Sequence, residues 1–255
     1  MEKEIWLEYL TWMEIKAAIA GGFDTVLLIA GSIEQHGPHL PISTDTVLGY
    51  ELAERTARKM GKTLVAPVVR PGMSEHHMAF PGTITLSKET FMATVSEYVH
   101  SLARHGFRRI AVTYSHGGNA AALAELLPRL AAELPDTEIL SIPGNDAFGK
   151  AIQHIAEADG IDQQTMGVHA GEFETSAMLA YDDAQVRSEK LSAGYKADFS
   201  KDKEKLAKHL QDGLHTITDN GVLGDARPAD KARGERYLDA VTDYISKSFI
   251  RVEAK

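Results

Sequence analysis

The feature that most constrains the fold is a short apolar run, Thr25 to Ala30 (TVLLIA), which follows Gly21-Gly22. A short and continuous apolar run of this kind is typical of a β-strand that is buried on both faces. Strands buried on both faces occur mainly in parallel sheets that helices cover on each side. The run therefore predicts a layered fold with a central sheet.

The rest of the chain alternates between strand-like and helix-like segments. Strands are expected at 25–30, 63–69, 109–114 and 138–142, and helices at about 45–60, 88–105, 119–134 and 146–158. This alternation indicates βαβ units around a largely parallel sheet. Segments 203–217 and 228–249 are expected to form amphipathic closing helices, and no repeat or linker divides the chain. We therefore expect one α/β domain over residues 1–255.

Composition narrows the class of partner. The chain has 255 residues, a formal net charge of -9 and no cysteine. The acidic balance argues against a nucleic-acid partner, which would attract clustered Lys and Arg. No apolar run approaches the ~20 residues of a membrane span, and the N-terminus lacks the basic and apolar regions of a signal peptide. We expect a cytoplasmic protein without a membrane partner, and any metal must be held by carboxylate, imidazole and water.

Three potential metal ligands follow the first strand in the loop GSIEQHGPHLPISTD at 31–45. Alternate residues of an extended segment point the same way, so Glu34 and His36 can reach one ion. Asp45 closes the same loop. Open α/β sheets keep their ligand crevice at the carboxyl ends of the strands. The plainer alternative is a polar loop with incidental acid and imidazole groups.

A further imidazole follows the strand at 109–114, in the segment SHGGN at 115–119. His116 is therefore expected at the same edge of the sheet as the first loop. The paired glycines Gly117 and Gly118 fit a tight turn where the backbone approaches another group closely. Asn119 is expected to cap the next helix.

The third cluster is HAGEFETS at 169–176. If the chain is helical from Gly171 onward, His169 and Glu172 lie near one face of the N-terminal turn, and Glu174 points elsewhere. Glu172 is therefore the expected carboxylate from this segment.

The combined set contains three carboxylates and two imidazoles, and it suits two divalent ions of zinc, manganese or iron. The expected metal ligands are Glu34, His36, Asp45, His116 and Glu172. Asp45 is the expected bridge between the ions, which would activate a water molecule and polarise a carbonyl. His169 is the expected proton carrier, and together with Glu172 it forms the expected catalytic pair.

Residues near the crevice are candidates for substrate binding. Ser74, His76 and His77 precede the segment FPGT, and we expect them to contact substrate. Gly117, Gly118 and Asn119 are expected to do so from the other loop. For the two adjacent histidines a solvated polar loop is an even alternative, because neighbours on an extended segment face opposite sides.

The chain resembles the creatininase family of metal-dependent amidohydrolases. The resemblance is carried by GSIEQHGPHLPISTD at 31–45, FPGTITLS at 80–87, SHGGN at 115–119 and HAGEFETS at 169–176. It implies a three-layer α/β/α sandwich with a mostly parallel central sheet, and a homo-oligomer, often a hexamer. It also implies that Glu34, Asp45 and His116 bind one metal, that His36, Asp45 and a further Glu bind the other, and that His169 lies near the substrate. Creatininase itself has that Glu two residues after the histidine, where this chain has Gly118, so Glu172 is the expected replacement.

These observations predict a dinuclear metallohydrolase that opens a small, polar, cyclic substrate at a carbonyl carbon. The bond is expected to be the C–N bond of a lactam, a formamide or a similar amide. One alternative is a ring-opening C–C hydrolase that acts on a cyclic polyhydroxy ketone of the inosose type. An alternative of another class is a non-catalytic or peptide-handling accessory protein in cofactor maturation, which would keep its partner affinity after His169→Ala.

Overall fold

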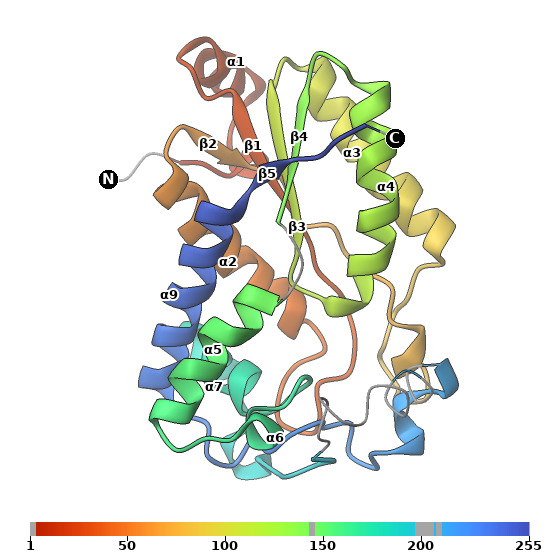
Figure 1. Cartoon of the computed structure of the whole chain (residues 1–255), viewed down its shortest axis with the longest axis vertical. Coiled ribbons are helices and arrows are strands. Elements are labelled where there is room, and N and C mark those ends of the chain that lie inside the picture. Colours follow the sequence, from red (N-terminus) through yellow and green to blue (C-terminus); the bar gives the residue numbers. More distant parts are fainter. Residues whose placement is uncertain (1–3, 143–145, 197–206, 208–210, 255) are drawn as a thin grey trace.

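The computed structural model describes residues 4–142, 146–196, 207 and 211–254, and its centre is a five-stranded sheet (Figure 1). The strands are β1 (Thr25–Ala30), β2 (Thr63–Val65), β3 (Arg109–Tyr114), β4 (Glu138–Ser141) and β5 (Ile250–Arg251), in the order β2-β1-β3-β4-β5. The first four pair in parallel, whereas β5 is antiparallel to β4. All six residues of β1 are buried, as its apolar sequence predicted.

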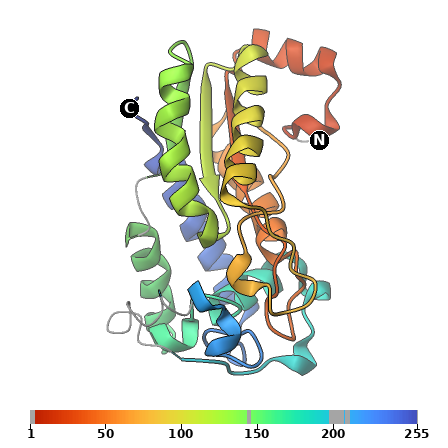
Figure 2. The same cartoon turned by 90° about the vertical axis from the view of Figure 1, so that its right-hand side faces the viewer.

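Helices cover both faces of this sheet. Helices α3 (Lys88–Arg104) and α4 (Ala120–Glu133) lie side by side on one face (Figure 2). On the other face lie α2 (Thr44–Met60) and, packed against it, α9 (Lys231–Ser248). The predicted three-layer α/β/α sandwich is therefore confirmed.

Local sequence signals account for the positions of several helices. Ser87 accepts a hydrogen bond from the Thr90 amide and so begins α3, whose Phe91, Val95 and Val99 recur at helical spacing and are buried. Asp230 caps α9 in the same way, which is why that helix begins at Lys231 and not at 228.

The other helices are α1 (Trp12–Ala20), α5 (Asp146–Ala158), α6 (Gln163–Met166) and α7 (Glu172–Asp182). Single 3-10 turns occur at Leu7–Tyr9, Glu75–His77, Gly117–Asn119, Asp183–Gln185, Ser188–Lys190 and Leu214–Thr216.

Two expected elements differ from the structure. The strand expected at 63–69 ends at Val65, because Pro67 has no N–H group to continue the ladder, although Val69 pairs again with Ala30. Of the helix expected at 203–217, residues 203–206 and 208–210 fall outside the described residues; of the rest, residues 207, 211 and 212 are helical, and a 3-10 turn follows at Leu214–Thr216. No helix in the described part of the chain combines the length and the apolar character needed to cross a membrane.

The segments that bear the candidate ligands meet beyond the carboxyl ends of the parallel strands. These are the loops that follow β1 and β3, the 3-10 turn at Glu75–His77 and the start of α7. They lie in the lower half of Figure 1, below the sheet. The fold therefore brings together segments that are far apart in the sequence.

Candidate metal centre

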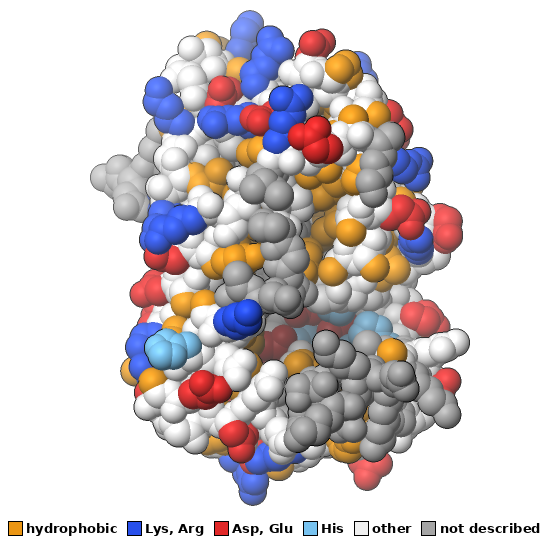
Figure 3. Space-filling model, in the orientation of Figure 1, with side chains coloured by type: hydrophobic (Ala, Val, Ile, Leu, Met, Phe, Trp, Pro, Cys, Tyr) orange, Lys and Arg blue, Asp and Glu red, His pale blue; other side chains and the backbone are white. Residues whose placement is uncertain are grey.

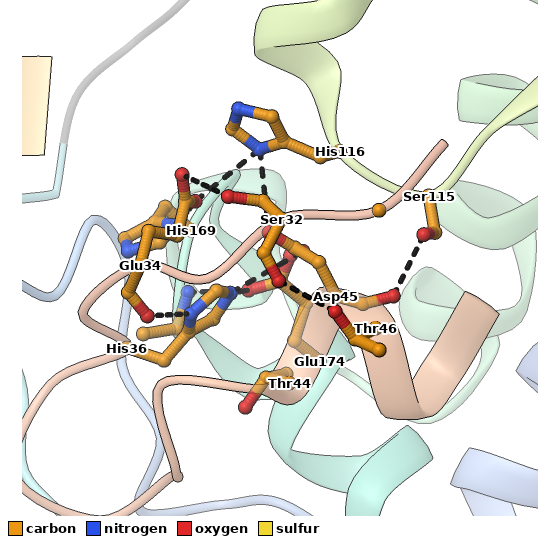
Figure 4. Close-up of polar contacts among 12 residues, drawn as sticks. Ser32, Glu34, His36, Thr44, Asp45, Thr46, Ser115, His116, His169 and Glu174 are labelled. Atoms are coloured by element: carbon orange, nitrogen blue, oxygen red, sulfur yellow. Dashed lines mark hydrogen bonds and ion pairs between the residues drawn. The ribbon is translucent and has the colours of Figure 1, made fainter. Parts of the chain in front are cut away.

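Five acidic and imidazole side chains converge in a buried cluster, and Figure 4 shows them pointing toward one another. Glu34 and His36 follow β1, Asp45 lies in the first turn of α2, His116 follows β3, and Glu174 lies in the first turn of α7. Two groups with potential ligand atoms within 4.8 Å of one another consist of these side chains alone, Glu34 with Asp45 and His116, and His36 with Asp45 and Glu174. Asp45 belongs to both of them, and two further groups join Glu34 with His76 and His77, and Glu34 with His36 and His169.

The separations between these atoms are those of ligands around a common ion. His116 Nδ1 lies 3.3 Å from Glu34 Oε1 and 3.3 Å from Asp45 Oδ2. His36 Nε2 lies 3.5 Å from Asp45 Oδ1 and 3.7 Å from Glu174 Oε2. Ligand atoms ~2.1 Å from a tetrahedral ion are themselves about 3.4 Å apart. Both groups therefore have a spacing that a divalent cation fits.

Two atoms of the cluster have unmet bonding capacity. His36 Nε2 and Asp45 Oδ2 are buried without a hydrogen-bond partner. An unpaired buried polar atom is costly, and a cation between the side chains would satisfy both. The donor set, carboxylate oxygens and imidazole nitrogens without sulfur, is one that zinc and manganese accept. The residues present therefore fit divalent ions.

Backbone carbonyls orient the imidazoles for this role. His36 Nδ1 lies 3.1 Å from the carbonyl oxygen of Glu34, and His116 Nε2 lies 2.9 Å from that of Met73. Since a carbonyl only accepts, each of these nitrogens donates. The other nitrogen of each ring faces the carboxylates, and it would offer its lone pair once a cation replaces the proton there, as in the usual arrangement of a metal-binding histidine.

The electrostatics of the cluster show an excess of carboxylate charge. Burial alone would lower the pKa of His36, but the carboxylates of Asp45, Glu174 and Glu34 outweigh it and raise that pKa to about 10. Burial, together with the charge of Asp45, raises the pKa of Glu174 to about 7 despite the nearby His36. In the metal-free protein, protons on these side chains therefore offset charge that a divalent cation would otherwise neutralise.

Gln35, between the two ligands of the first loop, organises two further histidines. Its Oε1 accepts from the Gly37 amide at 2.9 Å, which fixes the amide orientation. The two hydrogens on Nε2 face three acceptors, His77 Nδ1 at 2.9 Å, His169 Nε2 at 2.9 Å and the Gly221 carbonyl oxygen at 3.1 Å. His169 Nε2 also lies 2.8 Å from the Gln35 carbonyl oxygen.

The tautomers follow if His169 Nε2 carries the proton that the Gln35 carbonyl accepts, which leaves the hydrogens of Gln35 Nε2 for His77 and Gly221. Burial lowers the pKa of His169 well below its usual value and also lowers that of His77, so both rings are neutral near pH 7. His169 then holds its lone pair on Nδ1, which faces Glu34 Oε1 at 3.6 Å, and His77 holds its proton on Nε2 at 3.4 Å from the same oxygen. With these tautomers the cluster has one open base and one N–H donor beside Glu34.

Glu172, the expected ligand of the third segment, does not lie in the cluster. Its side chain is fully buried, with Oε1 accepting from Arg233 Nε at 2.6 Å and Oε2 from the Tyr237 hydroxyl at 2.9 Å. The expectation assumed that His169 shares a helical turn with Glu172. However, α7 begins only at Glu172, after Ala170 at φ 51° and an extended Gly171, so helical spacing does not relate these two residues. Glu174, which was expected to point elsewhere, is the residue that faces His36.

The candidate substrate-binding residues divide into two sets. His76, His77, Gly117 and Gly118 line a cavity of about 590 Å³, which we call the metal cavity and whose lining also includes Glu34, Asp45, His116, His169 and Glu174. This volume is within the range of small-molecule sites. Four of the six candidates therefore border the space that a substrate would enter.

Ser74 and Asn119 have positioning roles instead. Ser74 Oγ lies 2.6 Å from Ser32 Oγ, which in turn bonds Glu34 Oε2 at 3.2 Å. The Asn119 side chain donates to the Gly31 carbonyl at 3.0 Å and accepts from the Met73 amide at 3.0 Å. Asn119 stands at the start of α4 but does not cap it, because these two loops occupy its side chain.

Sequence reasoning passed over several residues of this site. Gln35 and Ser32 flank the predicted ligand Glu34, so their signal was proximity, but nothing in the sequence showed which groups they would bond. Val168 borders the metal cavity and is 52% exposed, although its neighbours in the sequence gave it no distinguishing pattern. These contacts depend on segments that only the fold brings together.

Several known proteins are similar to this chain over most of its length. Residues 8–249 match the family model "Creatininase: Creatinine amidohydrolase". The mycofactocin precursor peptide peptidase of Mycobacterium ulcerans is 33% identical over 232 residues, which are 88% of this chain and 84% of that protein. Creatinine amidohydrolase of Pseudomonas putida is 31% identical over 193 residues, 71% of this chain and 73% of that protein. A solved structure described as "Creatininase Mn" is 27% identical, with a TM-score of 0.74 and 96% of each chain covered.

Proposed function

This chain belongs to the creatininase family, and from that premise we propose that it hydrolyses amide C–N bonds with two divalent ions. The proposed ligands are Glu34, His36, Asp45, His116 and Glu174. The observation that carries the proposal is the position of Asp45, which is shared by two three-residue groups and has a buried oxygen without a partner. A shared carboxylate is the usual bridge of a two-metal site.

Zinc and manganese are the proposed metals. A solved mutant of creatininase described as "Zn-Zn type" is 27% identical over 96% of this chain, and another creatininase is described with Mn. The oxygen and nitrogen donors here suit both, and they also suit iron. Since availability and geometry select among such ions, the proposal extends to a hydrolase that works with more than one of them.

When bound, two such ions supply an activated water nucleophile and polarise the substrate carbonyl. In amide hydrolysis a C–O bond forms, the C–N bond breaks, and one proton of the water ends on the leaving nitrogen. His169 is the proposed carrier of that proton, because Nδ1 faces the cluster and has a free lone pair in the tautomer that donates to the Gln35 carbonyl. His77 presents an N–H group to the same space and is the proposed donor to the substrate.

An amide is favoured over a cyclic ketone by the relatives. The precursor peptidases and the creatinine amidohydrolase are named for amide-type bonds and are 31% identical or more. The 3-dehydro-scyllo-inosose hydrolase of Thermotoga maritima, which is named for a ketone substrate, is 26% identical over 88% of this chain. We therefore propose C–N cleavage as the main activity. A homo-oligomer and a location in the cytoplasm stay predictions.

The test combines metal analysis with turnover. Purified protein loaded with zinc or manganese should contain about two ions per chain, as a shared carboxylate implies, and should hydrolyse members of a panel of lactams, formamides and short peptides. Asp45→Asn should lower the content of both ions and abolish turnover, whereas the surface substitution Asp183→Asn should change neither. Retention of two ions by Asp45→Asn, or the absence of metal-dependent hydrolysis across the panel, would overturn the proposal.

A further inference from the structure

A second cavity of about 520 Å³ lies next to the metal cavity, and most of its wall is apolar. We call it the apolar chamber. Its wall includes Leu52 of α2, Ile152 of α5, Met166 of α6, Phe173 of α7, and Leu238 and Val241 of α9. Four helices and a turn of a fifth thus enclose one space beyond the carboxyl end of β3.

The chamber and the metal cavity are contiguous. Ser115, Gly117, Val168 and Glu174 line both of them. Glu174 is therefore both a member of the metal cluster and part of the chamber wall. Figure 3 shows acidic and histidine side chains deep in the hollow of this face, with hydrophobic side chains beside them. A molecule held at the ions would therefore lie next to the chamber.

Val168 marks the junction of the two cavities. It is 52% exposed, whereas the adjacent Met166, Gly167 and His169 are buried. An apolar side chain exposed between two cavities gains free energy when an apolar group of a ligand covers it. The junction is therefore suited to a ligand that has a polar part on the ions and an apolar part beyond Val168.

The burial of the wall limits the size of the occupant. Leu238 is 2% exposed, Val241 3% and Ile152 5%, so this part of the wall belongs to the packed core and does not form an open surface. A folded partner cannot cover these side chains, whereas a small apolar group fits the space beside them. Among the described residues of the wall, Glu174 and Lys150 are the charged ones, so a polyhydroxylated or anionic group would find few partners there.

We propose that the apolar chamber is a specificity site, which selects amide substrates that carry an aliphatic or aromatic group next to the scissile C–N bond. This inference rests on the proposed amidase function and narrows its substrate class. At about 520 Å³ the chamber has room for a hydrophobic amino-acid side chain, and its apolar wall suits a short peptide or a cyclic dipeptide-like amide better than a small, wholly polar ring. This differs from the small polar substrate that the sequence predicts.

The first test compares amides of increasing apolar size on the metal-loaded protein. Acetamide, isovaleramide and 3-phenylpropanamide vary the acyl side, and matching N-alkyl acetamides vary the amine side. We expect kcat/KM to rise roughly tenfold to hundredfold from the smallest to the largest group, as expected for burial of one Leu-sized or Phe-sized side chain. Val241→Trp, which narrows the chamber, should reduce this preference. Met13→Trp, an exposed position on α1, should leave it unchanged.

A binding measurement separates this inference from the proposed function. The methyl group of Met166 can be followed by NMR in the metal-free protein, with Met166→Leu to assign its signal. Titration with 3-phenylpropanamide should shift that signal, and acetamide should not. If acetamide is hydrolysed but neither a preference nor a shift is found, the specificity site is overturned while the amidase function stands. If no amide is hydrolysed but the signal shifts, the chamber is supported as a binding site and the amidase function fails.

Discussion

Two glutamates that lie two residues apart have opposite roles in this structure, and substitution of each by glutamine tests that assignment. Glu172 is fully buried and bonds Arg233 and Tyr237, whereas Glu174 faces His36 and Asp45. Glutamine keeps the size of the side chain and removes its charge. The pair is therefore matched in chemistry and in position on α7.

For Glu172→Gln we expect a loss of stability without a loss of metal. The substitution removes one of two carboxylate partners of the buried Arg233 guanidinium, which keeps Asp159 at 3.2 Å, so the cost is about 1–3 kcal/mol. For a chain of this size that loss lowers Tm by roughly 5 °C. The metal content should stay at the parent value, because the Glu172 carboxylate bonds α9 and does not face the cluster.

For Glu174→Gln we expect the reverse. The amide oxygen can still accept from the Ala170 N–H group, as the carboxylate does, and the repulsion from Asp45 is removed. The stability of the metal-free protein should therefore change by less than about 1 kcal/mol, the usual size of one hydrogen bond. One of two ions should be lost, together with the stabilisation that it supplies, which is about 2.7 kcal/mol at a free-metal concentration of ~100 Kd.

The assay combines elemental analysis with urea unfolding, each with and without added zinc. Both glutamine variants and the parent are measured side by side. The assignment is refuted if Glu172→Gln lowers the metal content and Glu174→Gln does not. Such a result would restore Glu172 as the ligand that the sequence predicts.

Three further predictions follow from the site. Gln35→Leu should keep the metal content and lower kcat by roughly 10–100-fold, the usual effect of losing a group that orients a site. It should also change the ¹⁵N chemical shifts that report the His77 tautomer. Unchanged shifts would contradict the role given to Gln35. Gly118→Ala should lower the metal content, because the added Cβ would lie 2.3 Å from His116 Nε2 and displace that ring. A metal content equal to that of the parent protein would contradict this displacement. Burial lowers the pKa of the His39 imidazole to about 4, so the unfolded chain binds a proton at this residue more readily than the folded chain does. The free energy of unfolding is therefore highest above pH ~6.5 and falls by up to about 3 kcal/mol as the pH drops to 4. In urea unfolding of metal-free protein, His39→Gln should flatten this part of the pH profile, and an identical slope would contradict the assignment.

The architecture was largely predictable from the sequence, because it depends on local patterns. The apolar run of β1 and the alternation after it give the parallel sheet and its covering helices. Caps are local too, as the start of α3 at Ser87 shows. The end of β2 at Val65 was missed, although the proline that interrupts the ladder is visible in the sequence.

Most candidate ligands could likewise be predicted from the sequence, whereas the apolar chamber could not. Glu34, His36 and Asp45 share one loop, and His116 follows the neighbouring strand, so their proximity follows from adjacent strand ends. The apolar chamber had no such signal, because α2, α5, α7 and α9 each contribute one part of its wall. A pattern of apolar residues shows that a helix has a buried face but does not show which cavity that face encloses.

The sequence by itself determined the layered α/β fold, the metal-type chemistry of the polar loops and the family. The choice between Glu172 and Glu174 was decided only by tertiary structure. The segment before α7 pairs with a distant one through the bridge between His169 and Leu223, and a Cβ on Gly167 would lie 2.2 Å from the Leu223 carbonyl oxygen. That contact fixes where the helix can begin, and the starting residue of a helix determines the direction in which each of its side chains points.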